Sequence, residues 1–402
     1  MRFPEFLKPG GSIGLPAPSY GCADDYHRAR LLAAISTFEK TGYKVLPGPN
    51  AFSEEGIGKS NTPEKCGAEL NDFFLHDAAD VLISCGGGET MCEDLPFVDF
   101  DAIRKAEPKW FMGYSDNTNL TFLLPTLCDI AAVYGQCAPA FGMREWHASL
   151  DDDFRILTGK TDAEEKDGAQ TCEVPAAGRA AAAEAPTFTF TNYGAWARNR
   201  HSEEGEDRQE DAAQGSQETF PEEPAETQTE EPEEDYLAPW ELNEPYRMSV
   251  FRPGETAPTE EKVQAGGRLL GGCMDCLSVL CGTRFDKVKD FTEKYRDDGI
   301  LWFLEACDLN PMAIRRSLWQ MREAGWFAHA KGFLFGRPLH YEEELFGMNR
   351  INAVLGALEG LDVPVFLDID LGHLPPAIPM ITGAAAYVSA ENNRLTVRQV
   401  LR

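Results

Sequence analysis

The stretch Lys109-Trp-Phe-Met-Gly-Tyr-Ser-Asp-Asn-Thr118 decides how the fold is interpreted, because it joins a buried strand to a helical pattern. Three large apolar residues in succession, closed by a glycine, are typical of a strand that is covered on both faces of a sheet. A helical pattern then runs from Thr118 to Leu127. A strand followed at once by a helix predicts one unit of an α/β fold.

The same rhythm continues through the preceding residues. Strands are predicted at Ser12–Pro18, Tyr43–Leu46 and Val81–Cys85, and helices from Asp24 to Lys40 and from Thr62-Pro63, where proline takes the first helical position. Strands that alternate with helices predict a parallel sheet with helices on both faces. We assign this domain to residues 1–150.

A compositional change sets residues 151–262 apart as a linker. Between residues 202 and 235 there are 15 acidic residues and one arginine, so about half of the net charge of −29 falls in this segment. A segment with so few large apolar residues cannot bury enough surface to offset the entropy of ordering, and we predict a disordered insertion at about 196–236. The acidic balance argues against nucleic acid or a membrane surface as a partner and favours a small-molecule or peptide substrate.

Short strands return in the last part of the chain, which we assign to a second domain, residues 263–402. Strands are predicted at Ile300–Leu304, Lys331–Gly336, Val363–Leu367, Ala385–Ser389 and Leu395–Gln399, with a helix that opens at Asn310-Pro311. This domain is predicted to be mixed and rich in strands.

The chain carries no signal of export or membrane insertion. Its N-terminal residues lack the apolar run of a signal peptide, and no later stretch has about 18 apolar residues in succession. The eleven cysteines form no repeating framework, and several lie within apolar runs, as buried thiols do. We therefore expect a cytoplasmic protein without disulfides.

Ser115 is the first candidate catalytic residue. It lies at the end of a predicted strand and just before a helical pattern, which is where a nucleophile is exposed and backbone N–H groups point at an oxyanion. A serine followed by aspartate is also an ordinary way to begin a helix, so both interpretations stay open from this stretch alone. Asn117 stands where the Gly-x-Ser-x-Gly elbow of α/β-hydrolases has its last glycine.

The glycine loop Cys85-Gly-Gly-Gly-Glu-Thr90 follows another predicted buried strand. Three glycines allow the backbone to approach a ligand closely or to surround an anion. The loop lacks the sequence of a P-loop and the spacing of a dinucleotide site. A phosphate site, a tight structural turn, and a site for an oxyanion or a substrate carboxylate all remain open.

Two residues of the second domain could assist a serine nucleophile. Glu305 ends the apolar run that begins at Ile300, where an ionised carboxylate is costly unless it has a partner. His373 has the most constrained setting of the seven histidines, in the stretch Leu371-Gly-His-Leu-Pro-Pro-Ala377. A lone histidine before two prolines is nevertheless often an exposed residue without a functional role. Paired, they would supply a base and the carboxylate that orients it.

The cysteines offer two further interpretations. Cys273-Met-Asp-Cys276, with Cys281, suggests zinc, but no second cysteine pair or histidine pair accompanies it, and packing of thiols is favoured. Cys85 could be a nucleophile, but it does not have glycine on both flanks, and the His-x-Glu partner of glutamine-hydrolysing domains is missing. We expect no metal site and no cofactor.

Together these residues resemble the serine LD-carboxypeptidase family, which includes the microcin-immunity hydrolases. The resemblance covers roughly residues 8–145 and 263–390. It is carried by four blocks: Gly14-Leu-Pro-Ala-Pro-Ser19; residues 83–134 with the glycine loop, Asp99-Phe-Asp101 and Gly113-Tyr-Ser-Asp116; Gly267-Arg-Leu-Leu-Gly-Gly272 through Glu305 and on to Gly336; and Gly372-His373.

The resemblance implies a role for each candidate residue. Ser115 would be the nucleophile, His373 the general base that later protonates the leaving group, and Glu305 the residue that orients His373. The backbone N–H groups of Asp116 and of Gly86 or Gly87 would bind the oxyanion. The resemblance also implies a Rossmann-like first domain, a strand-rich second domain that closes on it, and a homodimer.

Substrate choice is open, because the glycine loop differs from the Arg-Gly-Gly-Tyr-Gly form of murein-recycling enzymes and the acidic insertion has no expected counterpart. The first hypothesis is hydrolysis of a peptide or amide bond next to a free carboxylate, as in the L,D bond of a murein tetrapeptide. The alternatives are detoxification of a peptidyl-nucleotide antibiotic and a binding module that holds an anion without catalysis.

Overall fold

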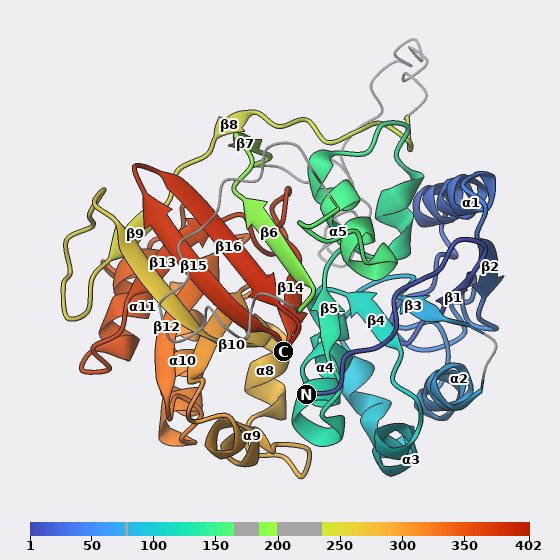
Figure 1. Ribbon diagram of the computed structural model, residues 1–402, viewed down its shortest axis with the longest axis horizontal. Coiled ribbons are helices and arrows are strands. Elements are labelled where there is room, and N and C mark those ends of the chain that lie inside the picture. The colour runs from blue at the N-terminus through green and yellow to red at the C-terminus, as the bar shows by residue number, and fades with distance from the viewer. Residues whose placement is uncertain (77–78, 165–184, 199–234) are drawn as a thin grey trace, which may run out of the picture.

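The structure, a computed structural model, describes residues 1–76, 79–164, 185–198 and 235–402. Figure 1 shows two sheets beside one another, one built mainly from the first third of the chain and one built mainly from the last. Most of the acidic insertion predicted at 196–236 lies outside the described residues. The prediction of an α/β fold with two different sheets is confirmed.

The first sheet has six strands in the order β14-β5-β4-β3-β1-β2. They are β1 (Ser12–Leu15), β2 (Lys44–Pro47), β3 (Val81–Ile83), β4 (Trp110–Gly113), β5 (Ala132–Tyr134) and β14 (Met380–Thr382). The first five are parallel, as predicted, whereas β14 arrives from near the end of the chain and pairs antiparallel with β5. From β1 the chain turns to β2 on one side and then to β3 on the other. In such sheets ligands bind beyond the carboxyl ends of the strands at this reversal.

Helices cover this sheet: α1 (Asp25–Lys40), α2 (Pro63–Leu75), α3 (Phe100–Lys105), α4 (Thr118–Thr121) and α5 (Ala148–Thr158). Short 3₁₀ turns lie at Met91–Glu93, Leu95–Phe97, Ser115–Asn117 and Ala138–Gly142. The helix predicted from Thr118 to Leu127 is wrong in its length, because α4 ends at Thr121 and a π turn follows at Leu124–Cys128. Pro125 has no N–H with which to continue the helical hydrogen bonds.

The second sheet has eight strands in the order β6-β16-β15-β10-β11-β12-β13-β9. They are β6 (Thr187–Thr191), β9 (Ser249–Phe251), β10 (Val263–Cys273), β11 (Ile300–Glu305), β12 (Ala330–Gly336), β13 (Val365–Ile369), β15 (Ala385–Glu391) and β16 (Arg394–Val400). The strands β10 to β13 are parallel to one another, and the others are antiparallel to their neighbours. The sheet is therefore mixed, as predicted.

Four helices accompany the second sheet: α8 (Met274–Leu280), α9 (Val288–Lys294), α10 (Pro311–Glu323) and α11 (Arg350–Leu358). A separate pair of short strands is formed by β7 (Ala195–Trp196) and β8 (Glu244–Pro245). Among the described residues, no helix combines the length and the apolar character needed to cross a bilayer.

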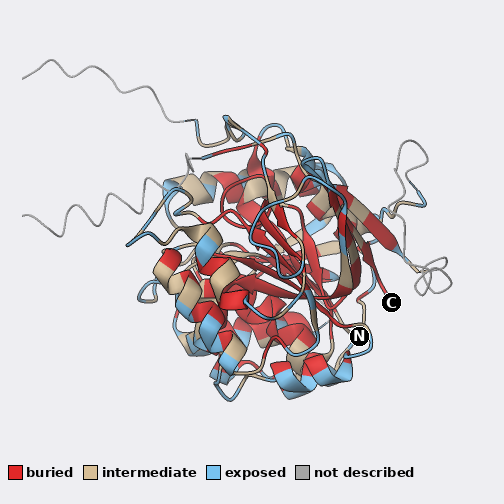
Figure 2. Ribbon diagram, turned by 90° about the vertical axis from the view of Figure 1, so that its left-hand side faces the viewer, coloured by how far each residue is buried: buried red, intermediate tan, exposed pale blue. Residues whose placement is uncertain are grey.

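Apolar contacts between the two sheets are extensive. Tyr134 of β5 packs on Phe303 of β11 with ring centroids 5.6 Å apart, and Phe122 stacks on Trp326 at 5.3 Å. Figure 2 shows buried residues running through the strands of both sheets, with the exposed residues on the surrounding helices and loops. A core shared in this way holds the carboxyl ends of β4 and β11 in a fixed relation. This matters because Ser115 lies in the turn after β4 and Glu305 ends β11.

Candidate active site

Ser115 occupies the turn directly after β4, where its backbone adopts a left-handed conformation with φ of 60°. Residues other than glycine rarely adopt this conformation, and such strain is found at turns that present a nucleophile. The N–H of Ser115 donates a hydrogen bond to the hydroxyl of Tyr134 at 3.2 Å, which fixes the turn to the neighbouring strand β5. The side chain of Ser115 is half-buried.

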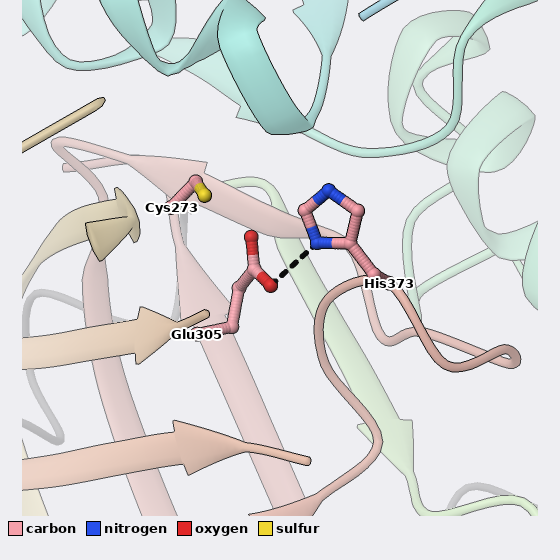
Figure 3. A group of neighbouring side chains, drawn as sticks. All are labelled: Cys273, Glu305 and His373. Carbon is pink, nitrogen blue, oxygen red and sulfur yellow. Dashed lines mark hydrogen bonds and ion pairs between the residues drawn. The ribbon is translucent and has the colours of Figure 1, made fainter. Parts of the chain in front are cut away.

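His373 and Glu305 lie in line with this serine. The Nε2 atom of His373 is 2.8 Å from Oγ of Ser115, and its Nδ1 atom is 2.7 Å from Oε2 of Glu305. Glu305 is the last residue of β11, and His373 lies in the loop after β13. Figure 3 shows the imidazole with one ring nitrogen directed at the carboxylate. The three residues that the sequence analysis singled out are thus in one hydrogen-bonded chain.

The carboxylate of Glu305 is buried, with 1% of the residue exposed, and it is held in its charged form. Burial raises the pKa of Glu305, but the charge of His373 and the hydrogen bonds from His373 and Tyr134 outweigh burial, so the pKa lies below its usual value. Tyr134 donates to Oε1 of Glu305 at 2.5 Å, and burial followed by this negative charge raises the pKa of Tyr134 well above its usual value. Whenever His373 is in its neutral form, an ionised Glu305 fixes the ring proton on Nδ1 and leaves Nε2 as an acceptor toward Ser115.

Gly372 makes room for this pair. Its φ is +96°, and a β-carbon at this position would lie 2.6 Å from Oε2 of Glu305. Only glycine can therefore precede His373 without displacing the carboxylate.

The glycine loop after β3 packs directly on Ser115. A β-carbon on Gly87 would lie 3.1 Å from Oγ of Ser115, so a side chain there would press on the hydroxyl. Within the described chain, the backbone N–H groups of Gly87 and Asp116 donate to no other residue. The carbonyl of Gly86 instead accepts a hydrogen bond from Nδ2 of Asn117 at 2.7 Å. Gly87 and Asp116 therefore lie beside Ser115 with free donors. Gly86 joins the loop to the serine turn through its carbonyl, and among the described residues its own N–H likewise has no acceptor.

Asn117 explains the missing glycine of the elbow motif. Its Nδ2 atom also donates to the carbonyl of Tyr114 at 3.0 Å, and its side chain fills the space over Gly113, where a β-carbon would lie 2.8 Å from Cγ of Asn117. The turn is thus stabilised by a side chain that bonds to two backbone carbonyls, and it does not depend on a second glycine.

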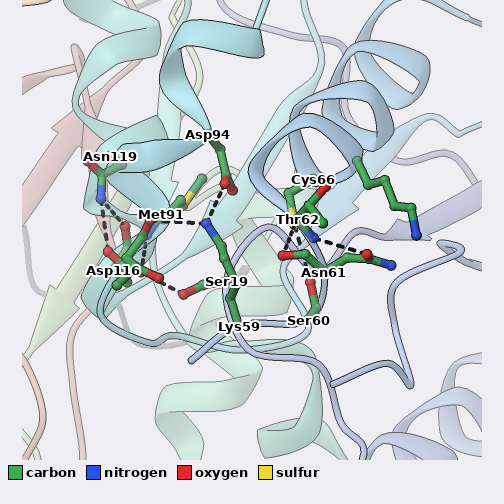
Figure 4. Close-up of polar contacts among 12 residues, drawn as sticks. Ser19, Lys59, Ser60, Asn61, Thr62, Cys66, Met91, Asp94, Asp116 and Asn119 are labelled. Atoms are coloured by element: carbon green, nitrogen blue, oxygen red, sulfur yellow. Dashed lines mark hydrogen bonds and ion pairs between the residues drawn. The ribbon is translucent and has the colours of Figure 1, made fainter. Parts of the chain in front are cut away.

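The side chain of Asp116 joins the loops that surround the serine, and sequence reasoning missed this role. Its carboxylate accepts hydrogen bonds from the hydroxyl of Ser19 at 2.6 Å, the N–H of Met91 at 2.9 Å and Nδ2 of Asn119 at 2.9 Å. Figure 4 shows these contacts and, beside them, the buried ion pair of Lys59 with Asp94. Burial raises the pKa of Asp116, and these hydrogen bonds partly offset the effect. The loops after β1, β3 and β4 are therefore fixed to one carboxylate.

The cysteines contradict two of the interpretations left open above. Cys85 is fully buried, donates to the carbonyl of Leu15 at 3.4 Å, and has a pKa raised well above its usual value by burial, so it is a packing thiol. Cys281 lies at the far end of α8, where Asp286 and Gln320 are its neighbours, so it does not form a set with Cys273 and Cys276. All ten cysteines of the described residues are free, as expected.

Comparison with protein families identifies both halves of the chain. Residues 13–135 match the model of the LD-carboxypeptidase N-terminal domain, and residues 266–388 match that of the LD-carboxypeptidase C-terminal domain. The candidate residues Ser115, Glu305 and His373 all fall inside these two matches.

The chain is similar in sequence to a microcin self-immunity protein and to a putative carboxypeptidase. The microcin C7 self-immunity protein MccF of Escherichia coli is 28% identical over 114 residues, which is 28% of this chain and 33% of MccF. This chain therefore matches about a third of the length of that relative. A putative carboxypeptidase of Treponema pallidum is 19% identical over 367 residues, which is 91% of this chain and 86% of that protein.

A solved structure of MccF in complex with aspartyl sulfamoyl adenosine superposes on this chain with a TM-score of 0.69. The superposition covers 100% of this chain and 99% of that one at 17% sequence identity. At this identity the likeness establishes a common fold.

Proposed function

The chain belongs to the LD-carboxypeptidase family, and from this premise we propose that it is a serine peptidase or amidase whose nucleophile is Ser115. The observation that supports the proposal most strongly is the continuous contact from Oγ of Ser115 through the imidazole of His373 to the carboxylate of Glu305. A protein that only binds an anion needs no such relay, because binding requires donors and not a base aligned with a hydroxyl.

In the proposed mechanism, Nε2 of His373 takes the proton of Ser115 as Oγ attacks the carbonyl carbon of the scissile bond. Glu305 stabilises the imidazolium that forms, and the N–H groups of Gly87 and Asp116 stabilise the oxyanion. His373 then gives its proton to the leaving amine, and water hydrolyses the acyl-enzyme by the same steps in reverse. The strained turn of Ser115 and the packed glycine loop hold these groups in place before the substrate arrives.

The proposed substrate carries a peptide or amide bond next to a free carboxylate, such as the L,D bond of a murein tetrapeptide. The second candidate is a peptidyl-nucleotide or aminoacyl-sulfamoyl nucleotide, and it is supported by the similarity in fold to MccF bound to aspartyl sulfamoyl adenosine. We also propose that the enzyme acts in the cytoplasm and that it is a homodimer. Sedimentation of the purified protein would test the dimer.

The function is tested by incubating the purified protein with an L,D-containing tetrapeptide and with aminoacyl-sulfamoyl adenylates, and by following release of the terminal group. Ser115→Ala should abolish release, with a loss of roughly 10⁴-fold or more. Ser278→Ala is the matched control, because this serine of α8 donates only to the carbonyl of Met274. Release by Ser115→Ala at the wild-type rate would refute the nucleophile, and no release from any substrate would favour the binding module.

A further inference from the structure

A group of potential metal ligands lies beside Nδ1 of His373, the ring nitrogen that faces Glu305, whereas Nε2 faces Ser115. The sulfur of Cys273, a carboxylate oxygen of Glu305 and a ring nitrogen of His373 all lie within 4.8 Å of one another, and all three residues are buried. Cys273 ends β10 directly opposite Glu305, which ends the neighbouring strand β11. Figure 3 shows the carboxylate between the sulfur and the imidazole. The thiol therefore lies beside the carboxylate because the two residues are paired in neighbouring strands of the sheet.

This combination of ligands selects a particular class of ion. A thiolate, an imidazole and one carboxylate suit Zn²⁺ and the softer Cd²⁺, whereas Mg²⁺ and Ca²⁺ prefer sites made wholly of oxygen. Three protein ligands leave a fourth position for water in a tetrahedral site. We propose that Cys273, Glu305 and His373 form an inhibitory site for Zn²⁺ or Cd²⁺, in which the metal replaces the hydrogen bond between His373 and Glu305.

Binding of an ion at this site would change which ring nitrogen of His373 carries the proton, and the proposed mechanism depends on that position. The thiol of Cys273 loses its proton to solvent and binds the ion as a thiolate, while Glu305 binds in the charged form that it already has. Nδ1 of His373 can bind the ion only through its lone pair, so the ring proton moves from Nδ1 to Nε2. The imidazole therefore stays neutral, and the one proton released on binding is that of the Cys273 thiol. Nε2 then donates toward Oγ of Ser115 and can no longer accept its proton. The inhibitory effect, though not the binding itself, rests on the proposed function.

A second thiol extends the site toward the nucleophile. Cys276 contacts Cys273, and its Sγ atom lies 3.6 Å from the carbonyl of Ser115 and 3.7 Å from Oδ1 of Asp116. Both cysteines lie at the first turn of α8, whose N-cap is Cys273. Ser115 is half-buried and its Oγ lies 2.8 Å from Nε2 of His373, so only one side chain separates the imidazole from the surface on this side. A thiophilic ion that reaches His373 from this side therefore meets sulfur close by.

Binding is tested without any substrate, so that failure of the proposed function would not affect the result. The full chain, reduced and freed of metal by a chelator, is titrated with Cd²⁺ while the ultraviolet thiolate-to-cadmium absorption is followed, and with Zn²⁺ by calorimetry. One ion should bind to the wild type and to Cys281→Ser. Cys273→Ser and Glu305→Gln should each weaken binding at least roughly tenfold. Thermal unfolding of each variant confirms that it is folded, and only folded variants are compared.

Equal affinity of the wild type and Cys273→Ser for both ions would overturn the proposal. A cadmium absorption band that is lost in Cys281→Ser but kept in Cys273→Ser would also overturn it. If the protein hydrolyses a member of the substrate panel, Zn²⁺ should inhibit the wild type and a chelator should restore its activity. The inhibition constant should rise at least roughly tenfold in Cys273→Ser, compared with that variant's own activity.

Discussion

The two sheets contribute to the candidate site in opposite ways. The first sheet presents Ser115 on a strained, half-buried turn that is surrounded by loops and free N–H groups. The second sheet supplies Glu305 and His373 from a buried position, where the carboxylate accepts hydrogen bonds on both oxygens. The nucleophile thus depends on backbone geometry, whereas the base depends on a buried charge that is fully paired. Changes in the two regions should therefore have different consequences.

The largest effect is expected from removing the buried charge. Glu305→Gln keeps the size of the side chain but cannot stabilise the imidazolium, so kcat should fall by roughly 10⁴-fold. The variant should also lose stability, because His373 and Tyr134 then share a neutral partner in a buried place. Steady-state kinetics and urea unfolding of the variant measure the two losses. A fall in kcat of less than tenfold would contradict the role of Glu305.

A smaller effect is expected in the glycine loop. In Gly87→Ala the new methyl group would lie 3.0 Å from Cβ and 3.1 Å from Oγ of Ser115, so the loop must move by a few tenths of an ångström. Because the oxyanion donor moves with it, kcat should fall by roughly tenfold or more while the unfolding free energy changes little. Gly194→Ala is the control, since no atom lies within 4 Å of its added methyl. Equal kinetics for both variants would show that the loop does not position Ser115.

The smallest effect concerns stability and pH at Asp94, which is buried with Lys59 beneath the loops. Burial raises the pKa of Asp94 to about 7, and its hydrogen bond to Lys59 only partly offsets this. Its protonated form is thus favoured by folding, so its contribution to stability is complete at pH values below about 4 and is lost as the pH rises through 7. Asp94→Asn lacks this titration. The stability of the wild type relative to Asp94→Asn should therefore decline from pH 4.5 to 7.5, as urea unfolding would measure.

Much of the fold could be predicted from local patterns, because most of the parallel strands contain a short apolar run and several helices begin at a recognisable capping residue. Asp24 and Asn310 do cap their helices as such signals predict. The antiparallel addition of β14 to the first sheet could not be predicted, since pairing between residues about 250 positions apart leaves no local trace. The helix after Ser115 is shorter than predicted, because Pro125 lacks the N–H that would continue its hydrogen bonds and a π turn follows instead.

The site shows the same division. Ser115, Glu305 and His373 could be singled out as candidates because each breaks a local pattern: a serine at a strand end, a carboxylate ending an apolar run, and a histidine in a stiff loop. These patterns alone left other interpretations open, and it was the family resemblance that joined the three residues. The side-chain roles of Tyr134, Asp116 and Ser19 could not be predicted, because a tyrosine at the end of an apolar strand and an aspartate after a serine are ordinary local patterns. Their roles arise from hydrogen bonds across the sheets, such as that from Tyr134 to Glu305, 171 residues away.

The central claim is that groups from the two sheets act as one catalytic unit, and a double-mutant cycle tests it most directly. The value of kcat/KM is measured for the wild type, Ser115→Ala, Glu305→Gln and the double variant, with the substrate that the panel identifies. Residues that act as a unit are strongly non-additive, so the double variant should be no more than a few-fold slower than Ser115→Ala alone. Losses that multiply, with the double variant slower by the full additional factor of Glu305→Gln, would contradict the claim.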